Sequence, residues 1–329
     1  MEQGGANKVI KKCPLFSICG GCRYDFTSPD YRAEKIKKID GWNLSNEPFW
    51  TTPGARRRAD FCFSGGDFGF YERGTKNIIR VDMCPNLLPE INAILPKLSA
   101  LPWVGTGSAL VTVCDNGIDL AINSDVPYFT REFKDAVAKM PFIRVTWNGG
   151  TVTQTATPKI SFAGHTVDYP PNAFLQPTVQ SENAMREFVV QHIEPNARVA
   201  DLFCGLGNFT FAANADGQGR DGVSKANADG FDVMGNGMKR DLFKNPLSVK
   251  MLNTYDVVIM DPPRAGALAQ TKLIAESNVK KVIYVSCNPI TLRRDAKILT
   301  NAGYKITAST AFDQFVGSDH WEIAVVFEK

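Results

Sequence analysis

The second half of the chain, residues 166–329, alternates short apolar stretches with stretches that favour helices. The apolar stretches have the length and composition of buried strands, and they are Val199–Phe203, Tyr255–Met260, Val282–Val285 and Ile323–Phe327. Alternating strands and helices predict a mostly parallel sheet that is covered by helices on both faces. This half of the chain therefore predicts an α/β fold.

Three of these strands run into residues that can carry chemistry. One ends in a Gly-containing turn, one in Asp-Pro-Pro-Arg beginning at Asp261, and one in Ser-Cys-Asn-Pro with its thiol at Cys287. Open α/β sheets bind their ligands at the carboxyl ends of the strands. A lone cysteine would be better interpreted as a small buried residue. A cysteine that is presented beside other polar segments can instead be a nucleophile.

Four segments, in the order of the chain, resemble the RNA 5-methyluridine methyltransferase family, which uses S-adenosylmethionine. They are Asp-Leu-Phe-Cys-Gly-Leu-Gly-Asn-Phe from Asp201, Asp-Pro-Pro-Arg from Asp261, Ser-Cys-Asn-Pro-Ile-Thr from Ser286, and Phe-Val-Gly-Ser-Asp-His-Trp-Glu ending at Glu322. A Gly-rich turn alone is weak evidence, because many nucleotide-binding sheets have one. Four ordered matches over residues 172–329 are specific, although Val316 stands where the family commonly has Pro. The resemblance implies a Rossmann-like SAM methyltransferase sheet.

The resemblance implies methyl transfer from S-adenosylmethionine to carbon 5 of a uridine in RNA, with Cys287 as nucleophile and Glu322 as base. Carbon 5 of uracil becomes nucleophilic enough only when a thiolate has added to carbon 6. A base must then remove the carbon-5 proton, so that the thiolate can leave. His320 lies two residues before Glu322, on the same face of an extended segment, and either assists this base or simply packs.

Four cofactor-binding residues are implied by the same resemblance: Gln176, Phe203, Asn208 and Asp261. Gln176 is expected to face cofactor and substrate, and Phe203 to lie beside the methionine moiety. Asn208 starts a helix, where backbone N–H groups lack partners and favour polar ligands. Asp261 is expected to contact the cofactor or the edge of the uracil.

The acidic residue that binds the ribose in this family has no clear counterpart here, because residues 209–255 are short and poor in apolar residues. A strand at Phe231–Gly235 would put Asn236 at that position, and the alternative is Asp221. Asp241, in a segment that resembles the one near the adenine, is a further candidate.

The amino-terminal cysteines suggest a metal centre. Cys13, Cys19 and Cys22 are closely spaced, and Cys84 is followed by Pro85. A cytosolic chain rarely holds disulfides, and thiolate-only ligation suits zinc or an iron–sulfur cluster. The segment also resembles the cluster segment of the ribosomal-RNA members of the family, in which a later Cys-Pro supplies the fourth ligand. The resemblance implies a 4Fe-4S cluster on all four cysteines, against zinc or reduced structural cysteines.

The chain has 329 residues and 44% apolar residues, enough for two domains. We expect an N-terminal iron–sulfur cluster segment and a small, β-rich α+β RNA-facing domain in residues 1–165, and the SAM-dependent methyltransferase domain in residues 166–329. The first part predicts an antiparallel platform, with a helix within Pro89–Ala100 that Pro96 kinks or breaks. We expect no β-barrel before the cysteine segment.

A formal net charge of +3 does not by itself indicate nucleic acid, but basic residues cluster at Arg56–Arg58 and Lys35–Lys38. They are either phosphate contacts or an ordinary solvated face. Arg56, Arg58, Phe61 and Phe63 are expected to form a platform for an unstacked RNA strand. The sequence has no membrane-spanning stretch and no secretory signal, so we expect a cytoplasmic monomer without membrane contact.

The resemblance of the cysteine segment to the ribosomal-RNA members of the family implies 23S ribosomal RNA as the substrate, in preference to transfer RNA. The departures from the family leave two alternatives, a tRNA uridine methyltransferase and an RNA-binding protein of the same fold with lost or weakened catalysis. A methyltransferase that acts on an exocyclic amine would need neither Cys287 nor Glu322. An iron–sulfur electron carrier would leave the second half of the chain unexplained.

Overall fold

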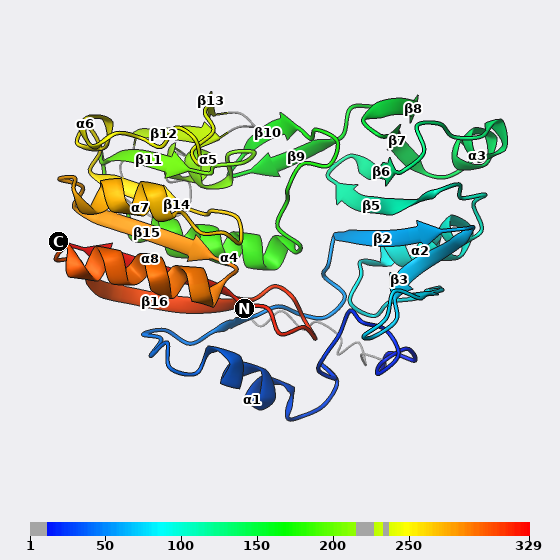
Figure 1. The fold of residues 1–329 in the computed structure, drawn as a ribbon, viewed down its shortest axis with the longest axis horizontal. Coiled ribbons are helices and arrows are strands. Elements are labelled where there is room, and N and C mark those ends of the chain that lie inside the picture. Colours follow the sequence, from blue (N-terminus) through cyan, green and yellow to red (C-terminus); the bar gives the residue numbers. More distant parts are fainter. Residues whose placement is uncertain (1–11, 215–226, 233–236) are drawn as a thin grey trace, which may run out of the picture.

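The computed structural model describes residues 12–214, 227–232 and 237–329. In this described part the strands form a seven-stranded sheet, an eight-stranded sheet and a two-stranded hairpin. Figure 1 shows the two large sheets side by side, with the hairpin of β9 (Lys159–Phe162) and β10 (His165–Asp168) between them. The predicted boundary between residues 165 and 166 falls at the start of β10 and stays a prediction.

The seven-stranded sheet comes from the first half of the chain (Figure 1). Its order is β4 (Ile78–Ile79), β3 (Asp67–Tyr71), β2 (Arg58–Ser64), β5 (Thr106–Cys114), β6 (Gly117–Ser124), β7 (Phe142–Trp147) and β8 (Gly150–Gln154). Neighbours are antiparallel except β6 and β7, which are parallel and connected through α3 (Arg131–Val137). The prediction of an antiparallel platform is wrong for this one pair. Parallel neighbours need a crossover connection, and α3 lies in the connection between β6 and β7.

The helix α2 (Pro89–Ser99) packs on the core of this sheet and runs through Pro96. Leu95 and Leu98, on either side of the proline, are fully buried, and this burial offsets the backbone hydrogen bond that proline cannot make. Pro96 therefore does not break the helix, and the alternative, a kink at this residue, stays a prediction. Phe61 and Phe63 belong to the same core and are 1% and 0% exposed, so the prediction that they face RNA is also wrong.

The eight-stranded sheet holds the strands predicted for the second half. Its order is β1 (Phe49–Trp50), β16 (Lys305–Asp313), β17 (Glu322–Glu328), β15 (Lys281–Ser286), β14 (Val257–Met260), β11 (Arg198–Leu202), β12 (Asn227–Asp232) and β13 (Met238–Lys239). All neighbours from β15 to β13 are parallel, whereas β17 is antiparallel to both β15 and β16. The predicted mostly parallel sheet is confirmed, with one antiparallel strand inserted.

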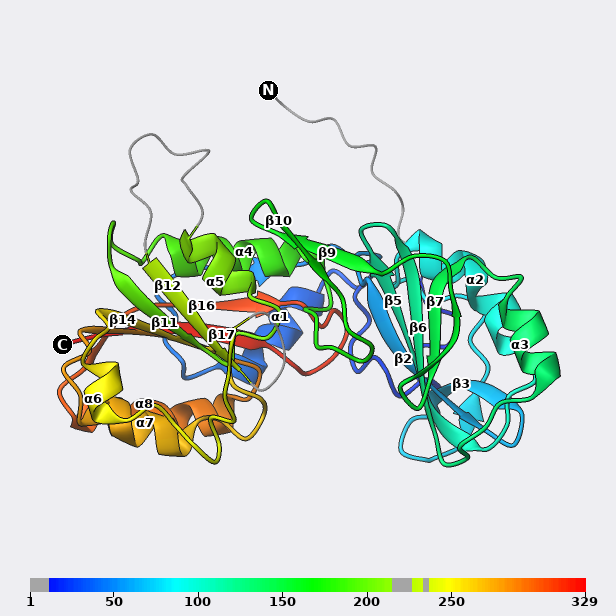
Figure 2. The ribbon, with the colours of Figure 1, turned by 90° about the horizontal axis from the view of Figure 1, so that it is seen from above.

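Helices cover both faces of this sheet (Figure 2). The helices α4 (Val179–Val190) and α5 (Asn208–Asn214) lie on one face, and α6 (Val249–Leu252), α7 (Leu268–Ala275) and α8 (Pro289–Asn301) lie on the other. Two apolar clusters, one on each face, bury the strands almost completely. Burial on both faces explains why these strands are continuous apolar runs in the sequence.

The amino-terminal elements α1 (Tyr31–Ile36), the 3-10 helix η1 (Lys37–Ile39) and β1 pack against the eight-stranded sheet. β1 pairs in parallel with the end of β16, and Lys35 forms a buried ion pair with Asp313. The prediction that Lys35 contacts phosphate is therefore wrong, because its ammonium group is used inside the protein. A second buried ion pair joins Arg57, the residue before β2, to Glu182 of α4 at 2.5 Å and so connects the two large sheets.

Candidate active site

The parallel strands end at one edge of the eight-stranded sheet, and this edge carries the residues singled out from the sequence. β11, β14 and β15 are neighbours in register, so Phe203, Asp261 and Cys287, which follow them, come to the same edge. Glu322 begins β17, which lies beside β15. Open α/β sheets bind their ligands at this edge.

The Cys287 thiol is half-buried on the turn between β15 and α8. Asn288 caps α8, and its side-chain Nδ2 donates to the carbonyl of Arg264 at 2.8 Å, which ties the cysteine turn to the Asp-Pro-Pro-Arg loop. Burial and the nearby Glu322 and Asp261 carboxylates raise the pKa of Cys287 to about 11, and Arg264 opposes this shift. At neutral pH the thiol therefore carries its proton.

The Glu322 carboxyl group is 3% exposed, and its two oxygens differ. Oε1 accepts a hydrogen bond from Nε2 of Gln314 at 2.8 Å, while Oε2 has no hydrogen-bond partner within the described residues. Burial and the Asp261 carboxylate raise the pKa of Glu322 well above its ordinary value, whereas Gln314 and Arg264 lower it. A buried carboxyl group with one open oxygen is suited to proton transfer.

Gln176 and Asp261 meet across the same edge, with Nε2 of the amide 3.3 Å from Oδ2 of the carboxyl group. Oε1 of Gln176 is buried and has no hydrogen-bond partner among the residues that the structure describes. Burial and the Asp201 and Asp232 carboxylates raise the pKa of Asp261 to about 7. The pair thus presents an open acceptor and a carboxyl group that titrates near neutral pH.

The Gly-containing turn after β11 places Phe203 and Asn208. Phe203 has a φ of +64°, a conformation that non-glycine residues other than Asn and Asp seldom adopt. Its ring lies 5.4 Å from that of Phe243, which is half exposed. Asn208 begins α5, and Arg186 donates to its Oδ1 at 2.9 Å.

Asp232 is a site residue that the sequence analysis missed. It ends β12, beside β11, and its Oδ2 accepts a hydrogen bond from the backbone N–H of Gly205 at 2.8 Å. The two proposed alternatives for this acid, Asn236 and Asp221, lie outside the described residues. Asp241 accepts backbone N–H groups of the turn that follows it. The signal that points to Asp232 is an acidic residue directly after an apolar one, Phe231. We expected a strand at Phe231–Gly235, which placed Asp232 inside the strand and not at its end.

His320 packs against the edge of the site instead of supporting the base. Its Nε2 lies 3.3 Å from Nη2 of Arg264, and its ring lies edge-on to that of Phe315. Burial and the Arg264 guanidinium lower the pKa of His320. Glu322 is bonded instead to Gln314, which the sequence analysis did not single out.

The four amino-terminal cysteines lie near one another. Each of the six pairs among Cys13, Cys19, Cys22 and Cys84 interacts electrostatically in the thiolate form. Burial and the neighbouring thiols raise the pKa of Cys22 to about 12 and that of Cys84 to about 11. Within the described residues, no group of three or more His, Cys, Asp or Glu side chains is arranged to hold a metal ion. The donor set has the chemistry of a cluster site, and the cluster itself stays a prediction.

The arginines expected to contact RNA are partly engaged inside the protein. Nε of Arg56 donates to the Arg58 carbonyl at 2.9 Å, and Nη1 of Arg58 donates to the Leu175 carbonyl at 2.7 Å. The Arg58 guanidinium also lies 5.4 Å from the ring of Phe174, which is 62% exposed. Arg58 therefore supports the segment that carries Gln176.

Across the described ranges, no helix is both long and apolar enough to cross a membrane.

Comparison with protein families gives one match over residues 238–329, to the tRNA (uracil-5-)-methyltransferase family. An uncharacterized RNA methyltransferase of Mesorhizobium japonicum is 35% identical over 351 residues, covering 98% of this chain and 85% of the relative. The 23S rRNA (uracil(1939)-C(5))-methyltransferase RlmD of Salmonella typhi is 26% identical, covering 97% of this chain and 81% of the relative.

Among solved structures, this chain is similar to the tRNA (uracil-54, C5)-methyltransferase of Pyrococcus abyssi, solved in complex with S-adenosyl-L-homocysteine. The match has a TM-score of 0.68 and 20% identity, and it covers 91% of this chain and 82% of that structure. This likeness shows an α/β methyltransferase fold.

Proposed function

The chain belongs to the RNA 5-methyluridine methyltransferase family, and from that premise we propose that it methylates carbon 5 of a specific uridine in 23S ribosomal RNA through a covalent adduct with Cys287. The observation that carries this proposal is the gathering of Cys287, Asp261 and Glu322 at one sheet edge, close enough to shift one another's pKa values. The choice of 23S RNA is supported by the cysteine pattern and by the likeness to RlmD over 97% of the chain.

The proposed reaction balances with the groups at this edge. As Sγ of Cys287 bonds to carbon 6 of the uracil, the thiol proton passes to solvent, and the electron pair of the double bond between carbons 5 and 6 moves into the ring to give an enolate. S-adenosylmethionine supplies an electrophilic methyl group, which carbon 5 takes as the bond from the sulfonium breaks. Glu322 then accepts the carbon-5 proton on its open Oε2. The electrons of that C–H bond restore the double bond between carbons 5 and 6, and the thiolate leaves.

The cofactor residues are proposed from their places around this reaction. Gln176 and Asp261 would bind the polar groups of cofactor or uracil through the open Oε1 and the carboxyl group. Phe203 would flank the methionine moiety, and Asn208 would bind near the start of α5. Asp232, at the end of β12, is the best-placed acid for the ribose hydroxyls.

The covalent mechanism is tested with the variant Glu322→Gln. Carbon 6 can still take the thiolate and carbon 5 the methyl group, but the proton stays, so an RNA adduct should accumulate and survive denaturing electrophoresis. Cys287→Ala should give neither adduct nor product while RNA binding persists, because a small side chain contributes little to an interface made mainly of phosphate contacts. Normal turnover in either variant would remove that residue from its role.

The RNA substrate is tested separately. Mass mapping of 5-methyluridine in ribosomal and transfer RNA, with and without the gene, should show loss of one site in 23S RNA. Loss of a site in transfer RNA would support the alternative substrate, and unchanged modification would support an RNA-binding role.

We also propose a 4Fe-4S cluster on Cys13, Cys19, Cys22 and Cys84, supported by the interactions among the four thiols. When bound, the cluster would hold the cysteine segment together, beside the loop that leads to Glu322, because Cys22 packs next to Gly317. Protein purified without oxygen should be brown and contain about four irons. Stoichiometric zinc without iron would reject the cluster.

A further inference from the structure

The Gln314 side chain is a buried amide in direct contact with the proposed base. It follows the last residue of β16, is 1% exposed, and donates from Nε2 to Oε1 of Glu322 at 2.8 Å. Its own Oε1 has no hydrogen-bond partner in the described part of the chain. Burying a polar oxygen without a partner costs free energy, so the fold maintains this amide at a cost.

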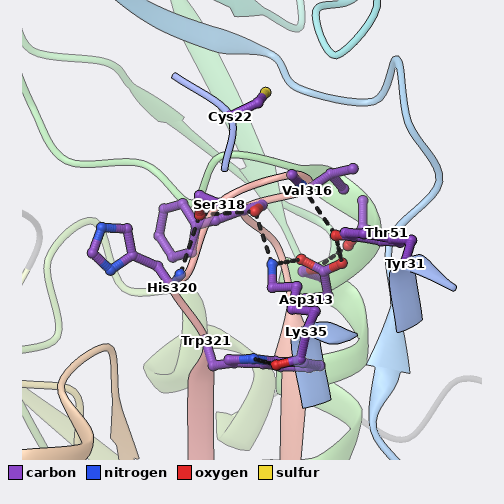
Figure 3. Close-up of polar contacts among 12 residues, drawn as sticks. Cys22, Tyr31, Lys35, Thr51, Asp313, Val316, Ser318, His320 and Trp321 are labelled. Carbon is purple, nitrogen blue, oxygen red and sulfur yellow. Dashed lines mark hydrogen bonds and ion pairs between the residues drawn. The ribbon is translucent and has the colours of Figure 1, made fainter. Parts of the chain in front are cut away.

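The helix α1 holds the backbone on both sides of Gln314 (Figure 3). Tyr31 donates its hydroxyl to Oδ2 of Asp313 at 2.5 Å, and Lys35 pairs with Oδ1 of the same carboxylate. The Lys35 ammonium also donates to the carbonyl of Phe315 at 2.9 Å. The residues immediately before and after Gln314 are therefore both bonded to one buried lysine.

The same helix also holds the segment that leads to Glu322. The backbone N–H of Gly317 donates to the Tyr31 hydroxyl at 3.0 Å, and Nε1 of Trp321 donates to the Lys35 carbonyl at 3.3 Å. Figure 3 shows Lys35 between Asp313 and Trp321, enclosed by the loop that joins β16 to β17. Gln314 lies at one end of this loop and Glu322 at the other, and α1 is bonded to the residues next to both.

We propose that Gln314 is the positioning residue of the catalytic base, which turns the Glu322 carboxylate so that its open Oε2 faces the carbon-5 proton, and that Tyr31, Lys35 and Asp313 hold Gln314 in place. The inference rests on the proposed role of Glu322 as base. An amide suits this position because its NH₂ group binds the ionised carboxylate and brings no competing charge.

The charges around Glu322 explain why this donor is needed. Burial and the Asp261 carboxylate favour the protonated form of Glu322, whereas Arg264 and Gln314 favour the ionised form that can accept a proton. The Cys287 thiol also faces this group, and its thiolate would add a further negative charge. Without the amide donor, Arg264 remains to lower the pKa of Glu322, and that pKa rises. The base then becomes available only at higher pH.

The test is Gln314→Met, which keeps side-chain length and loses the donor, with Gln191→Met at the exposed end of α4 as the matched control. Single-turnover release of tritium from RNA labelled at carbon 5 reports proton removal directly. We expect release to slow about ten- to a hundredfold near neutral pH, as for a lost hydrogen bond to a charged group. The covalent adduct should accumulate, and the rising limb of the pH profile should move to higher pH, while Gln191→Met matches the unmodified protein.

A second variant tests the support and covers the case in which Gln314→Met fails to fold. Tyr31→Phe removes one hydroxyl between Asp313 and Gly317 and keeps the ring. Adduct accumulation with unchanged cofactor affinity would support the inference. Tritium release rates and pH profiles like those of the unmodified protein in both variants would overturn the inference. If Gln314→Met does not fold, the same result in Tyr31→Phe would overturn it. If Glu322→Gln itself forms no adduct and turns over, the proposed function fails instead, which keeps the two failures distinguishable.

Discussion

At the residue scale, the charge state of the Cys287 thiol would decide when the proposed reaction can begin. The thiol lies half-buried beside two carboxyl groups, so its thiolate form is disfavoured. Binding of RNA can relieve this only by bringing carbon 6 to the sulfur or by changing the charges around it. A raised pKa of this kind would keep the proposed nucleophile unreactive toward other electrophiles.

We expect the Cys287 thiol to resist alkylation at moderate pH. With a pKa of about 11, only about a thousandth of it is thiolate at about pH 8, against roughly a quarter for an ordinary cysteine. Because the pKa is raised, reactivity should increase with pH up to about 11. Mass-resolved iodoacetamide labelling of the folded protein measures this for each cysteine. Rapid labelling of Cys287 at about pH 8 would contradict the raised pKa.

Replacing Asp232 by Asn should weaken cofactor binding about tenfold or more, because the carboxylate that we propose as the acceptor for the ribose hydroxyl groups is lost. The Asn side chain can still accept from the Gly205 N–H, so the turn after β11 should remain. Calorimetric titration with S-adenosylhomocysteine measures the change. Asp229→Asn, on the same strand and bonded to Tyr255, is the matched control and should bind normally.

Sequence reasoning located those residues whose neighbours in the chain form a pattern. Cys287 and Asp261 follow apolar strands directly, and the structure brings both to the predicted edge. Gln314 was missed because its partner, Glu322, lies eight residues further along the chain. The conformation of the loop between them could not be predicted from the sequence. Phe61 and Phe63 were misplaced because alternation in a strand does not say which face is covered.

At the element scale, the contact between α1 and β16 depends on a buried charge. Lys35 and Asp313 are both 0% exposed at their side chains, and desolvation of Lys35 lowers its pKa while Asp313 raises it. Neither residue was expected in this pairing, because 278 residues separate them in the sequence. A buried pair of this kind is costly to break from one side, since the remaining charge loses its partner.

We expect Lys35→Met to lower the free energy of unfolding by about 3–5 kcal/mol, because it leaves Asp313 buried without its cation. Urea denaturation followed by fluorescence measures this change. The control is Arg131→Met, which breaks the exposed Arg131–Asp135 pair and should stay within about 0.5 kcal/mol of the unmodified protein. Equal stability of Lys35→Met and the control would show that the ion pair contributes little.

At the scale of the whole molecule, the active-site edge can act only on a base that has left its stack. The thiol must reach carbon 6 while the methyl donor reaches carbon 5, and Cys287 is itself half-buried. We therefore expect methylation of a uridine in an RNA loop, and a sharp loss of activity when the same uridine is closed into a perfect duplex. Single-turnover methylation of two oligonucleotides that differ only in the opposing strand tests this. Equal rates would contradict extrusion of the base.

The general order of the sheet could be predicted from the sequence, whereas its far edge could not. Consecutive apolar runs with helices between them indicate parallel neighbours, as observed from β11 to β15. The insertion of β17 between β15 and β16 leaves no local signal, and the pairing of β1 with β16 joins opposite ends of the chain. Such long-range pairs are set by tertiary packing alone.

The bond between Tyr31 and Asp313 spans 282 residues, so it also orders events during synthesis. At about 5–20 residues per second, the amino-terminal helix leaves the ribosome roughly 15–60 s before its carboxylate partner is made. During that interval its lysine remains hydrated. Cys287 and Glu322, the proposed nucleophile and base, are translated long after α1, so the proposed support of Glu322 can form only when both segments have been made. A chain that stops before Asp313 would thus lack both the proposed base and the partner of Tyr31.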